Sequence, residues 1–577
     1  MSEARKQLEY WLNDPYFDDA TKQELTAIRN DDKEVEDRFY KELEFGTGGL
    51  RGVIGAGTNR MNIYTVRKAT QGLANYILKH GDPKKGVAIS YDCRRFSPEF
   101  AEETALCLAA NGIKAFVSDT LRPTPELSFA LRYFKCQAGV MVTASHNPPE
   151  YNGYKAYWED GAQMTPPHDV GVIDEVRAIT DYHEMKTMSR ADAEAAGLYV
   201  SWGEEIDAAY MKALKEQIIH QEAIDQAGGE LKIVYTPFHG ASLKPTTRIL
   251  KEIGFKNVYV VPEQEEPDPE FTTLEYPNPE DPKAFKLALE LAKEKDADIV
   301  LATDPDGDRL GIFAKDAKSG EYIMFTGNMS GMLIAEYVLH ERQATGRMPE
   351  KPAFVSTVVT TNLARAIAEN YGLHYVECLT GFKYIGEQIK IFEQAHSYNY
   401  VFGLEESYGC LAGTHARDKD ATVAVMLLSE LAAFYKTQGK TVWDAMLDIY
   451  EKYGYYKEGQ IAITMKGIEG AKEIAALMDR LRNDPPKTFG KWTVEEFRDY
   501  KSGETVRVKS GEKGKTGLPS SNVLYFALDD DAWCCARPSG TEPKIKFYIG
   551  VKGMSLEDAA DKEAKLTAAV KEAAGLK

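Results

Sequence analysis

Three aspartates stand on alternate positions of a short Pro- and Gly-containing loop, directly after a hydrophobic run: Asp304, Asp306 and Asp308. Three carboxylates this close repel one another, so the pattern favours a hard divalent cation among them. A calcium-binding EF-hand is excluded, because its sixth and twelfth positions would be Arg309 and Lys315. A solvated acidic turn is the alternative, but the arginine that follows favours a combined metal and phosphate site.

A serine lies at a second such corner, in the run Thr143-Ala-Ser-His-Asn-Pro148. At the end of a strand, the hydroxyl of Ser145 can be presented to a cleft. The neighbouring His146 is no evidence for a catalytic triad, because triad partners meet in space rather than in sequence. A plain turn rich in Ser and Asn remains the alternative. Lys155, ten residues later, is either a solvated surface lysine or a group that transfers protons.

Near the C-terminus, the run Arg537-Pro-Ser-Gly-Thr-Glu-Pro-Lys544 combines a guanidinium, two hydroxyls, a glycine and an ammonium in one rigid loop. These groups are typical of a phosphate-binding loop, with an ordinary β-turn as the alternative. Three further segments carry groups of this kind, although each alone could be ordinary surface: the Gly-rich run with Arg51, the run Glu405-Glu406-Ser407, and His415 to Lys419.

The elements expected to position these loops are short β-branched runs that alternate with helix-period segments, a pattern typical of βαβ units. The runs recur in sets of three, with offsets of 52, 66 and 47 residues from the first to the third run. We expect strands at Val87–Ser90, Lys114–Val117 and Gly139–Val142; at Lys232–Tyr235, Asn257–Val260 and Asp298–Leu301; and at Ala353–Ser356, His374–Glu377 and Tyr400–Gly403. The similar spacing predicts three copies of one architecture.

The polar loops follow the third strand of each set, and ligands of open α/β sheets bind beyond the carboxyl ends of strands. The sequence therefore predicts three similar mixed α/β domains in tandem, residues 1–205, 206–325 and 326–453, around one central cleft. Residues 454–577 differ, with expected strands at Gln460–Thr464, Val506–Val508, Val523–Phe526 and Lys544–Ile549 and a helix from about Ser555. They predict a C-terminal α+β domain with an antiparallel sheet.

Composition excludes several classes of protein. The 577 residues carry 70 Lys and Arg against 89 Asp and Glu, a net charge of −19 that argues against nucleic acid and anionic membranes as partners. No run is long and apolar enough for a membrane span, and the N-terminus lacks a signal-peptide core. Seven cysteines in so long a chain do not form a disulfide framework, so we expect a cytoplasmic protein.

Taken together and in order, the four loops resemble those of the α-D-phosphohexomutase family, most closely its glucose-phosphate members, over nearly the whole chain. The resemblance implies that Ser145 is a phosphoserine and that Asp304, Asp306 and Asp308, with a phosphoserine oxygen, bind one Mg²⁺. It places Arg309 opposite the transferring phosphoryl group and Lys155 as the general acid/base. Arg51, His146, His415 and Lys419 match positions around the reacting centre.

The resemblance also implies two groups of substrate ligands. Sugar-binding residues would be Thr380, Gly381, Phe382, Lys383, Glu405 and Ser407, although Leu404 stands where the family commonly has glycine. Residues that bind the non-reacting phosphate would be Arg537, Ser539, Gly540, Thr541 and Lys544. The implied reaction interconverts α-D-glucose 1-phosphate and D-glucose 6-phosphate, with glucose 1,6-bisphosphate as intermediate and activator.

Three alternatives stay open. The small-molecule sugar phosphate could be a pentose or mannose phosphate, as for a phosphopentomutase or a phosphomannomutase. The protein could instead be a sugar-phosphate-binding regulatory protein without activity, but a pure binder has no need for a serine beside a metal. A phosphatase is also conceivable, because the sequence does not report whether water is excluded from the site.

Overall fold

The computed structural model describes residues 2–46, 48–465, 467–539 and 544–576. The chain forms two compact units. Unit 1 comprises Met1–Gly327, Phe382–Gly403 and Ser407–Val442, and unit 2 comprises Asn328–Gly381, Leu404–Glu406 and Trp443–Lys577. None of the helices in the described ranges combines the length and the apolar composition that crossing a membrane requires.

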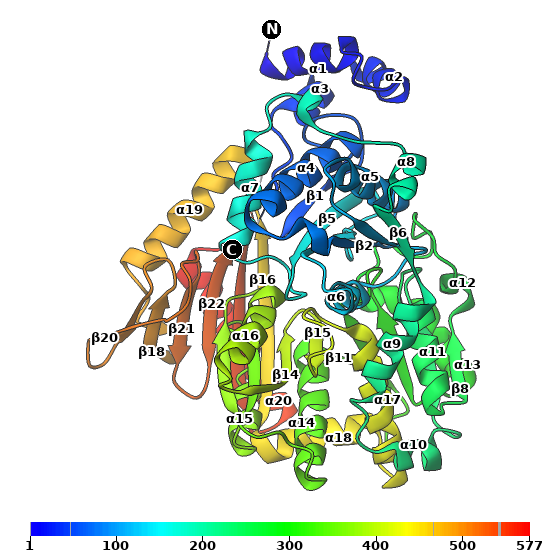
Figure 1. Ribbon diagram of the computed structural model, residues 1–577. Helices are drawn as coiled ribbons and strands as arrows, with labels where there is room; N and C mark the ends of the chain where they lie inside the picture. The colour runs from blue at the N-terminus through cyan, green and yellow to red at the C-terminus, as the bar shows by residue number, and fades with distance from the viewer. Residues whose placement is uncertain (1, 47, 466, 540–543, 577) are drawn as a thin grey trace. The chain divides into compact units, whose positions relative to one another are not determined.

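The first sheet of unit 1 has six strands in the order β1-β5-β4-β2-β3-β6 (Figure 1). Its strands are β1 Gly49–Val53, β2 Val87–Tyr91, β3 Ala115–Ser118, β4 Ala138–Val142, β5 Tyr151–Trp158 and β6 Tyr199–Trp202. Four of them, β4, β2, β3 and β6, are parallel neighbours, whereas β5 runs antiparallel to both β4 and β1. The sheet is therefore mixed.

Helices cover both faces of this sheet. Its helices are α4 Ile63–His80, α5 Ser97–Ala110, α6 Thr124–Tyr133 and α7 His168–Ala178. Successive side chains of a strand point to opposite faces. Accordingly Ile89 and Val140 pack with Leu108 of α5, while Ala88 and Met141 pack with Leu127 of α6. Burial on both faces explains why the central strands are continuous apolar runs.

A helical segment precedes the first sheet: α1 Glu3–Asn13, α2 Asp19–Ile28 and α3 Asp32–Phe39. Its core is aromatic, and the ring of Trp11 stacks on Phe17 with centroids 4.2 Å apart. Tyr64 at the start of α4 contributes to the same core, so the segment is anchored to the first sheet's own helices.

The second sheet of unit 1 has the order β11-β10-β9-β7-β8. Its elements are β7 Lys232–Thr236, β8 Asn257–Val260, β9 Ile299–Thr303, β10 Leu310–Lys315, β11 Tyr322–Phe325, α10 Gln221–Ala227, α11 Leu243–Ile253, α12 Pro262–Glu265 and α13 Lys286–Lys295. The first three strands are parallel, whereas β10 returns antiparallel to β9. Helix α13 covers one face through contacts of Ala288 and Ala292 with Val300.

Unit 1 also contains α8 Arg190–Ala195, α9 Glu204–Lys215, α16 Phe382–Ala395, β15 Gly409–Ala412 and α17 Ala421–Thr437. The elements of the third set that lie in unit 2 are β12 Pro352–Thr357, α15 Leu363–Asn370 and β13 His374–Cys378, in which β12 and β13 are parallel neighbours. Strand β14, Asn399–Glu405, and helices α14, Gly327–Ala344, and α18, Val442–Tyr453, contain residues of both units.

The C-terminal part of unit 2 is an antiparallel sheet in the order β16-β23-β22-β21-β18-β19-β20, with β17 beside β18 (Figure 1). Its elements are β16 Tyr455–Thr464, α19 Gly467–Asn483, β17 Thr488–Phe489, β18 Trp492–Asp499, β19 Glu504–Arg507, β20 Glu512–Lys515, β21 Leu524–Leu528, β22 Trp533–Pro538, β23 Lys544–Gly553 and α20 Leu556–Ala574. Met478 of α19 and Leu566 of α20 pack on Phe526 and Ile549, so both helices share the core of one face.

The structure confirms the expected fold class, and strands occur at all nine repeated runs and at the four C-terminal ones. The expected loops after β4 and β9 are the turns of antiparallel hairpins, because β5 and β10 fold back beside them. The domain boundaries and the central cleft stay predictions.

Candidate active site

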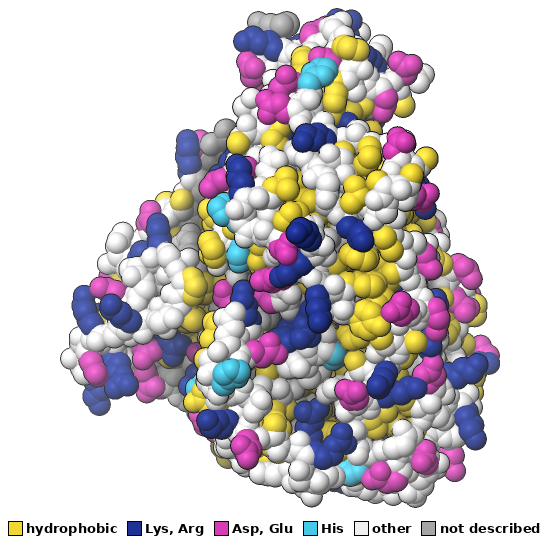
Figure 2. Space-filling view, in the orientation of Figure 1, with side chains coloured by type: hydrophobic (Ala, Val, Ile, Leu, Met, Phe, Trp, Pro, Cys, Tyr) yellow, Lys and Arg dark blue, Asp and Glu magenta, His cyan; other side chains and the backbone are white. Residues whose placement is uncertain are grey.

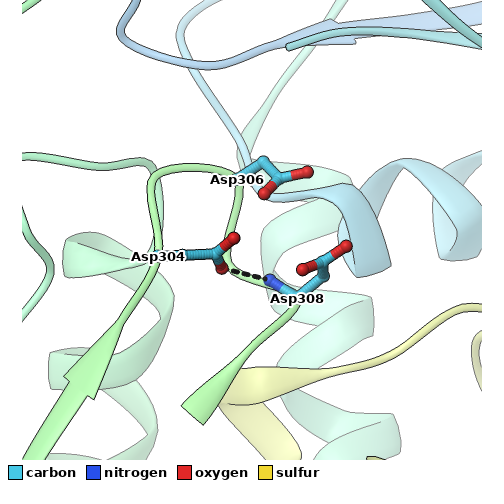
Figure 3. A group of neighbouring side chains, drawn as sticks. All are labelled: Asp304, Asp306 and Asp308. Atoms are coloured by element: carbon cyan, nitrogen blue, oxygen red, sulfur yellow. Dashed lines mark hydrogen bonds between the residues drawn. The ribbon is translucent and has the colours of Figure 1, made fainter. Parts of the chain in front are cut away.

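The three predicted metal ligands lie together on the loop between β9 and β10 (Figure 3). Carboxylate oxygens of Asp304, Asp306 and Asp308 are within 4.8 Å of one another, and none of these residues is more than 2% exposed. Oδ1 of Asp304 accepts hydrogen bonds from the backbone N–H groups of Asp308 at 3.1 Å and Arg309 at 3.0 Å. Gly307 adopts a φ of +68°, which favours glycine.

Two oxygens of this cluster have no hydrogen-bond donor in the described part of the chain: Oδ1 of Asp306 and Oδ1 of Asp308, both buried. Nε of Arg309 lies 3.8 Å from Asp308 Oδ1. Burying carboxylate oxygens without partners is costly. A donor set made of oxygens only fits a hard divalent cation, which would satisfy these two atoms.

The electrostatics of the cluster differ from one aspartate to the next. Burial, with the nearby charges of Asp306 and Asp308, raises the pKa of Asp304 well above its usual range. Burial acts in the same direction on Asp306, but the ammonium of Lys155 and hydrogen bonds outweigh it and lower the pKa of that carboxyl. The carboxyl of Asp304 thus favours the protonated form more than that of Asp306 does.

Ser145 lies beside this loop, although 159 positions separate it from Asp304. Its Oγ donates to Oδ2 of Asp304 at 2.7 Å and lies 3.2 Å from Nδ1 of His146. The residue is buried and has a φ of +52°, uncommon for a residue with a side chain. The predicted phosphoryl carrier and the predicted metal loop are thus brought together.

Two lysines approach the same carboxylates. Lys155 Nζ lies 2.6 Å from Asp306 Oδ2 and 3.4 Å from Asp308 Oδ2, and Lys419 Nζ lies 3.2 Å from Asp308 Oδ2. Burial disfavours the ammonium of Lys155, but the two aspartates outweigh this and raise its pKa. Lys155 comes from β5, whose antiparallel pairing with β4 returns it to the Ser145 loop.

Two more predicted residues border this centre. Arg51 on β1 donates from Nη1 to Oδ1 of Asn147 at 3.3 Å, and it lies within electrostatic reach of Asp306 and Asp308. Burial, with the positive charges of Arg309 and Arg51, holds the pKa of His146 well below its usual range. The imidazole is therefore neutral at pH 7.

Other predicted residues of unit 1 have different partners. Arg309 forms an ion pair with Glu280 at 2.7 Å. His415 Nε2 lies 2.7 Å from Asp420 Oδ2, so its ring is held at the start of α17 rather than among the three carboxylates.

The two predicted sugar ligands at the start of α16, Phe382 and Lys383, have different neighbours. Lys383 Nζ lies 3.5 Å from the buried Asp169, whereas the ring of Phe382 lies 5.6 Å from Lys419 Nζ. Ser407 precedes Tyr408, whose carbonyl accepts a hydrogen bond from the N–H of Leu310, directly after the metal loop. Phe382 and Ser407 thus lie near the reacting centre.

The predicted sugar-binding residues of unit 2 form their own cluster. Oε1 of Glu405 accepts a hydrogen bond from the N–H of Gly381 at 2.8 Å, which joins the two predicted loops. The buried hydroxyl of Thr380 has no hydrogen-bond partner within the described ranges. Leu404 keeps a regular strand conformation and is buried against Gly331. A residue larger than glycine at position 331 would place its Cβ 2.4 Å from the side chain of Leu404. The leucine at this position is thus accommodated.

The predicted phosphate loop connects β22 to β23. Arg537 hydrogen-bonds Tyr548, and Glu406 acts electrostatically on the same tyrosine, so Arg537 belongs to the neighbourhood of the sugar-binding loop. The N–H of Ser539 donates to the carbonyl of Lys544 at 2.7 Å and closes the base of the loop. Gly540 and Thr541 lie outside the described residues.

Sequence reasoning missed three residues of this centre. Thr124 donates from Oγ1 to Asp306 Oδ2 at 2.9 Å, and Asp418 lies 3.2 Å from Lys419 Nζ. Arg94 donates to the backbone carbonyl of Ser145 at 2.5 Å. Thr124 begins α6 and Arg94 lies in the loop before α5, both far from the motifs, and no local pattern marks them. Asp418 was missed although it directly precedes Lys419, which sequence reasoning did single out.

Comparisons with known proteins identify a family of similar proteins. Three models of phosphoglucomutase/phosphomannomutase match in tandem, alpha/beta/alpha domain I at residues 42–183, domain II at 208–319 and domain III at 326–453. A phosphoglucomutase of Staphylococcus aureus is 36% identical over 531 residues, which cover 92% of this chain and 93% of that protein.

Two solved structures share the fold. One is a phosphoglucomutase/phosphomannomutase family protein from Burkholderia thailandensis, with a TM-score of 0.63 and 20% identity over 91% of this chain and 97% of that one. The other is parafusin, a phosphoglucomutase from Paramecium, with a TM-score of 0.66 and 16% identity over 93% of this chain and 96% of that one. At these identities the structural likeness concerns the fold alone.

Proposed function

This chain belongs to the phosphoglucomutase/phosphomannomutase family, and on that premise we propose that it interconverts α-D-glucose 1-phosphate and D-glucose 6-phosphate. The observation that carries the proposal is the hydrogen bond of Ser145 Oγ to Asp304, within a buried group of three carboxylates. A buried serine beside a cation site and two lysines is suited to holding and releasing a phosphoryl group.

The cation would be Mg²⁺, held by Asp304, Asp306, Asp308 and an oxygen on Ser145. When bound, it would neutralise negative charge on the phosphoryl oxygens, as divalent cations do in phosphoryl transfer. The two buried carboxylate oxygens without donors, on Asp306 and Asp308, support this assignment because they need a positive partner.

In the first transfer, the 6-hydroxyl oxygen of glucose 1-phosphate would attack the phosphorus of phosphorylated Ser145. The bond from phosphorus to Oγ breaks and a bond from phosphorus to the sugar oxygen forms, while a protein base takes the hydroxyl proton and a protein acid gives a proton to Oγ. The products are glucose 1,6-bisphosphate and unphosphorylated Ser145, and the reverse step with the 1-phosphate completes the isomerisation. The transition state is loose and charged, so positioning and electrostatics dominate its catalysis.

The side chains around Ser145 would divide this work. Lys155 would transfer the proton and, as an ammonium, stabilise the departing oxygen. The neutral His146, whose Nδ1 lies 3.2 Å from Ser145 Oγ, is within hydrogen-bond reach of the reacting oxygen. Arg51, Arg309 and Lys419 would contribute positive charge to the transferring group, which requires Arg309 to exchange its partner Glu280 for a phosphoryl oxygen.

Unit 2 would bind the end of the sugar phosphate that is not reacting. Glu405 would offer carboxylate oxygens to sugar hydroxyls, and Thr380 would offer a hydroxyl that has no hydrogen-bond partner among the described residues. Arg537, Ser539, Gly540, Thr541 and Lys544 would bind the second phosphate, and His415 and Lys383 would contact the substrate. The bisphosphate must turn end over end between the transfers, so each end of the sugar is bound in turn.

We infer that the enzyme works in a reducing compartment, the cytoplasm. All seven cysteines are free, and six of them are buried. Disulfides are characteristic of oxidising compartments, and none is needed here.

The experiment that tests the substrate is a comparison of kcat/KM for the 1-phosphates of glucose, mannose, ribose and deoxyribose, each with Mg²⁺ and its matching bisphosphate. We expect the glucose phosphate to be preferred. A higher value with mannose or a pentose would instead assign a phosphomannomutase or a phosphopentomutase. Binding of glucose phosphates without turnover would support a regulatory binder, and release of inorganic phosphate would indicate a phosphatase.

A further inference from the structure

Arg94 is an almost fully buried arginine between β2 and α5, and its guanidinium binds the backbone of the Ser145 loop. Nη2 donates to the carbonyl oxygens of Ser145, at 2.5 Å, and Asn147. Nη1 donates to the carbonyl oxygens of Pro148, at 2.8 Å, and Tyr151, at 3.0 Å. One side chain therefore fixes four peptide groups within seven residues.

Asp92 completes this arrangement from the end of β2. Its Oδ2 lies 3.4 Å from Arg94 Nε and accepts a hydrogen bond from the hydroxyl of Thr143 at 2.6 Å. The same hydroxyl oxygen accepts from the N–H of Ser145 at 2.8 Å. Oδ1 of Asp92 accepts from the hydroxyl of Ser97 at 2.8 Å, which holds the carboxylate in place.

Both backbone polar groups of Ser145 are thus held, the N–H by Thr143 and the C=O by Arg94. This matters because Ser145 has a φ of +52°, a conformation that residues with a side chain avoid unless their surroundings enforce it. With the backbone in this conformation, Oγ meets Asp304. The conformation of the loop and the direction of the reacting hydroxyl therefore depend on the same contacts.

The positive charge of Arg94 also affects a neighbouring titratable group. The ring of Phe271 lies 5.1 Å from the guanidinium carbon and helps to enclose it. In this enclosed setting the positive charge of Arg94 contributes to the low pKa of His146. A lysine could keep the charge, but it has no planar fork to span four carbonyls.

We propose that Arg94, oriented by Asp92, is a positioning residue for phosphoryl transfer: it holds the Ser145 loop so that the serine oxygen faces the three aspartates before and after it loses its phosphoryl group. This inference rests on the proposed function. Substrate binding depends on other residues, so loss of Arg94 should reduce kcat and leave KM nearly unchanged.

The test compares Arg94→Ala with the wild-type enzyme and with Arg67→Ala. Arg67 is the matched control, because it is also buried in the first sheet's domain and paired with a carboxylate, Glu103 at 2.6 Å, but it binds no part of the Ser145 loop. For Arg94→Ala we expect kcat to fall about 100-fold, in line with the effect of small displacements at a reacting centre, with KM within about threefold. Arg67→Ala should keep kcat while its melting temperature falls.

Chemical rescue separates positioning from a general loss of structure. Millimolar guanidinium chloride, against an equal concentration of sodium chloride, should restore about a tenth or more of the kcat of Arg94→Ala, because the ion can occupy the vacated site. It should not raise kcat of Arg67→Ala. A kcat for Arg94→Ala within twofold of wild type, or a loss that guanidinium does not reverse, would overturn the proposal.

If Arg94→Ala does not fold, Arg94→Lys tests the proposal instead, because it keeps the positive charge and loses the planar guanidinium group. We expect its kcat to fall at least tenfold at unchanged KM, and a wild-type kcat would contradict the proposal. These outcomes differ from a failure of the proposed function, in which wild-type enzyme itself would neither carry a phosphoryl group nor turn over glucose 1-phosphate.

Discussion

The hydroxyl of Ser145 donates a 2.7 Å hydrogen bond to Asp304, from the turn of one hairpin to the turn of another. The two hairpins belong to different sheets of unit 1 and have the same form, a buried strand followed by an antiparallel return strand. The contact therefore joins two copies of the same hairpin motif. The proposed chemistry of the site depends on this contact.

Replacing Asp308 by Asn should weaken cation binding. The substitution leaves two carboxylates instead of three beside the ammonium groups of Lys155 and Lys419, and it alters a carboxylate whose Oδ1 is buried without a donor among the described residues. Titration calorimetry with Mg²⁺ should show affinity reduced at least tenfold. Asp316→Asn, in a turn where the side chain accepts hydrogen bonds from Ser319 and the backbone of Lys318, should bind Mg²⁺ like the wild-type protein. Equal affinity of Asp308→Asn and wild type would remove this aspartate from the metal site.

Replacing Lys155 by Met should slow the transfer step. We expect kcat to fall by about 10²- to 10⁴-fold, the usual contribution of a proton-transferring group, with a smaller change in KM. Rapid-quench measurement of phosphoryl transfer from prephosphorylated enzyme would report the step directly. Lys85→Met is the control, because Lys85 pairs with Glu159 on the surface. Transfer at the wild-type rate in Lys155→Met would assign the proton to another group.

Replacing Glu405 by Gln should weaken sugar binding. The amide oxygen can still accept the hydrogen bond from Gly381, so the loop is retained, but the charge that favours sugar hydroxyls is lost. A charged hydrogen bond lost in this way predicts KM higher by about tenfold. Steady-state kinetics in both directions would show it, with the exposed Glu512→Gln as control. An unchanged KM would exclude a direct contact with the sugar.

Replacing Glu458 by Gln should stabilise the protein at alkaline pH. Burial, partly offset by hydrogen bonds from Thr361 and Asn328, raises the pKa of Glu458 to about 7, and its Oε1 is buried without a hydrogen-bond partner in the described structure. The folded state thus prefers the protonated form. Stability associated with that proton is complete below the unfolded pKa of about 4.3 and is lost as pH rises through 7.

Thermal unfolding at pH 5 and pH 8 measures this effect. Glu458→Gln should exceed the wild-type melting temperature at pH 8 and match it more closely at pH 5, whereas Glu473→Gln on the exposed face of α19 should do neither. A difference between Glu458→Gln and wild type that is the same at both pH values would mean that Glu458 does not titrate between them.

Much of the fold could be predicted because its signals are local. The runs at β2, β4, β7 and β9 are buried on both faces, so they are continuous apolar stretches whatever surrounds them. The return strand β5 was not predicted, because its Asn, Gly, Lys and aromatic residues give no strand pattern. Its conformation depends on pairing with β4 and β1, and pairing between distant segments leaves no local trace.

The residues of the site also fall into two groups, those that local sequence signals reveal and those that only the fold reveals. Ser145 and the three aspartates stand in short motifs whose residue types already suggest their chemistry. Arg94 and Thr124 could not be found, because Arg94 binds backbone carbonyls and Thr124 contacts a carboxylate 182 positions away. The partners of Arg309 and Lys383 were also not predictable, since Glu280 and Asp169 are brought to them only by tertiary packing.

The most direct test of the account is the intact mass of the enzyme after incubation with glucose 1,6-bisphosphate and Mg²⁺, followed by addition of glucose 1-phosphate. We predict that wild-type protein gains the mass of one phosphoryl group, located on Ser145, and that this group exchanges with the sugar at a rate no slower than kcat. Ser145→Ala should gain no such mass and lose turnover. Turnover of Ser145→Ala at the wild-type rate, or a phosphoryl group on another residue that exchanges as fast, would contradict the account.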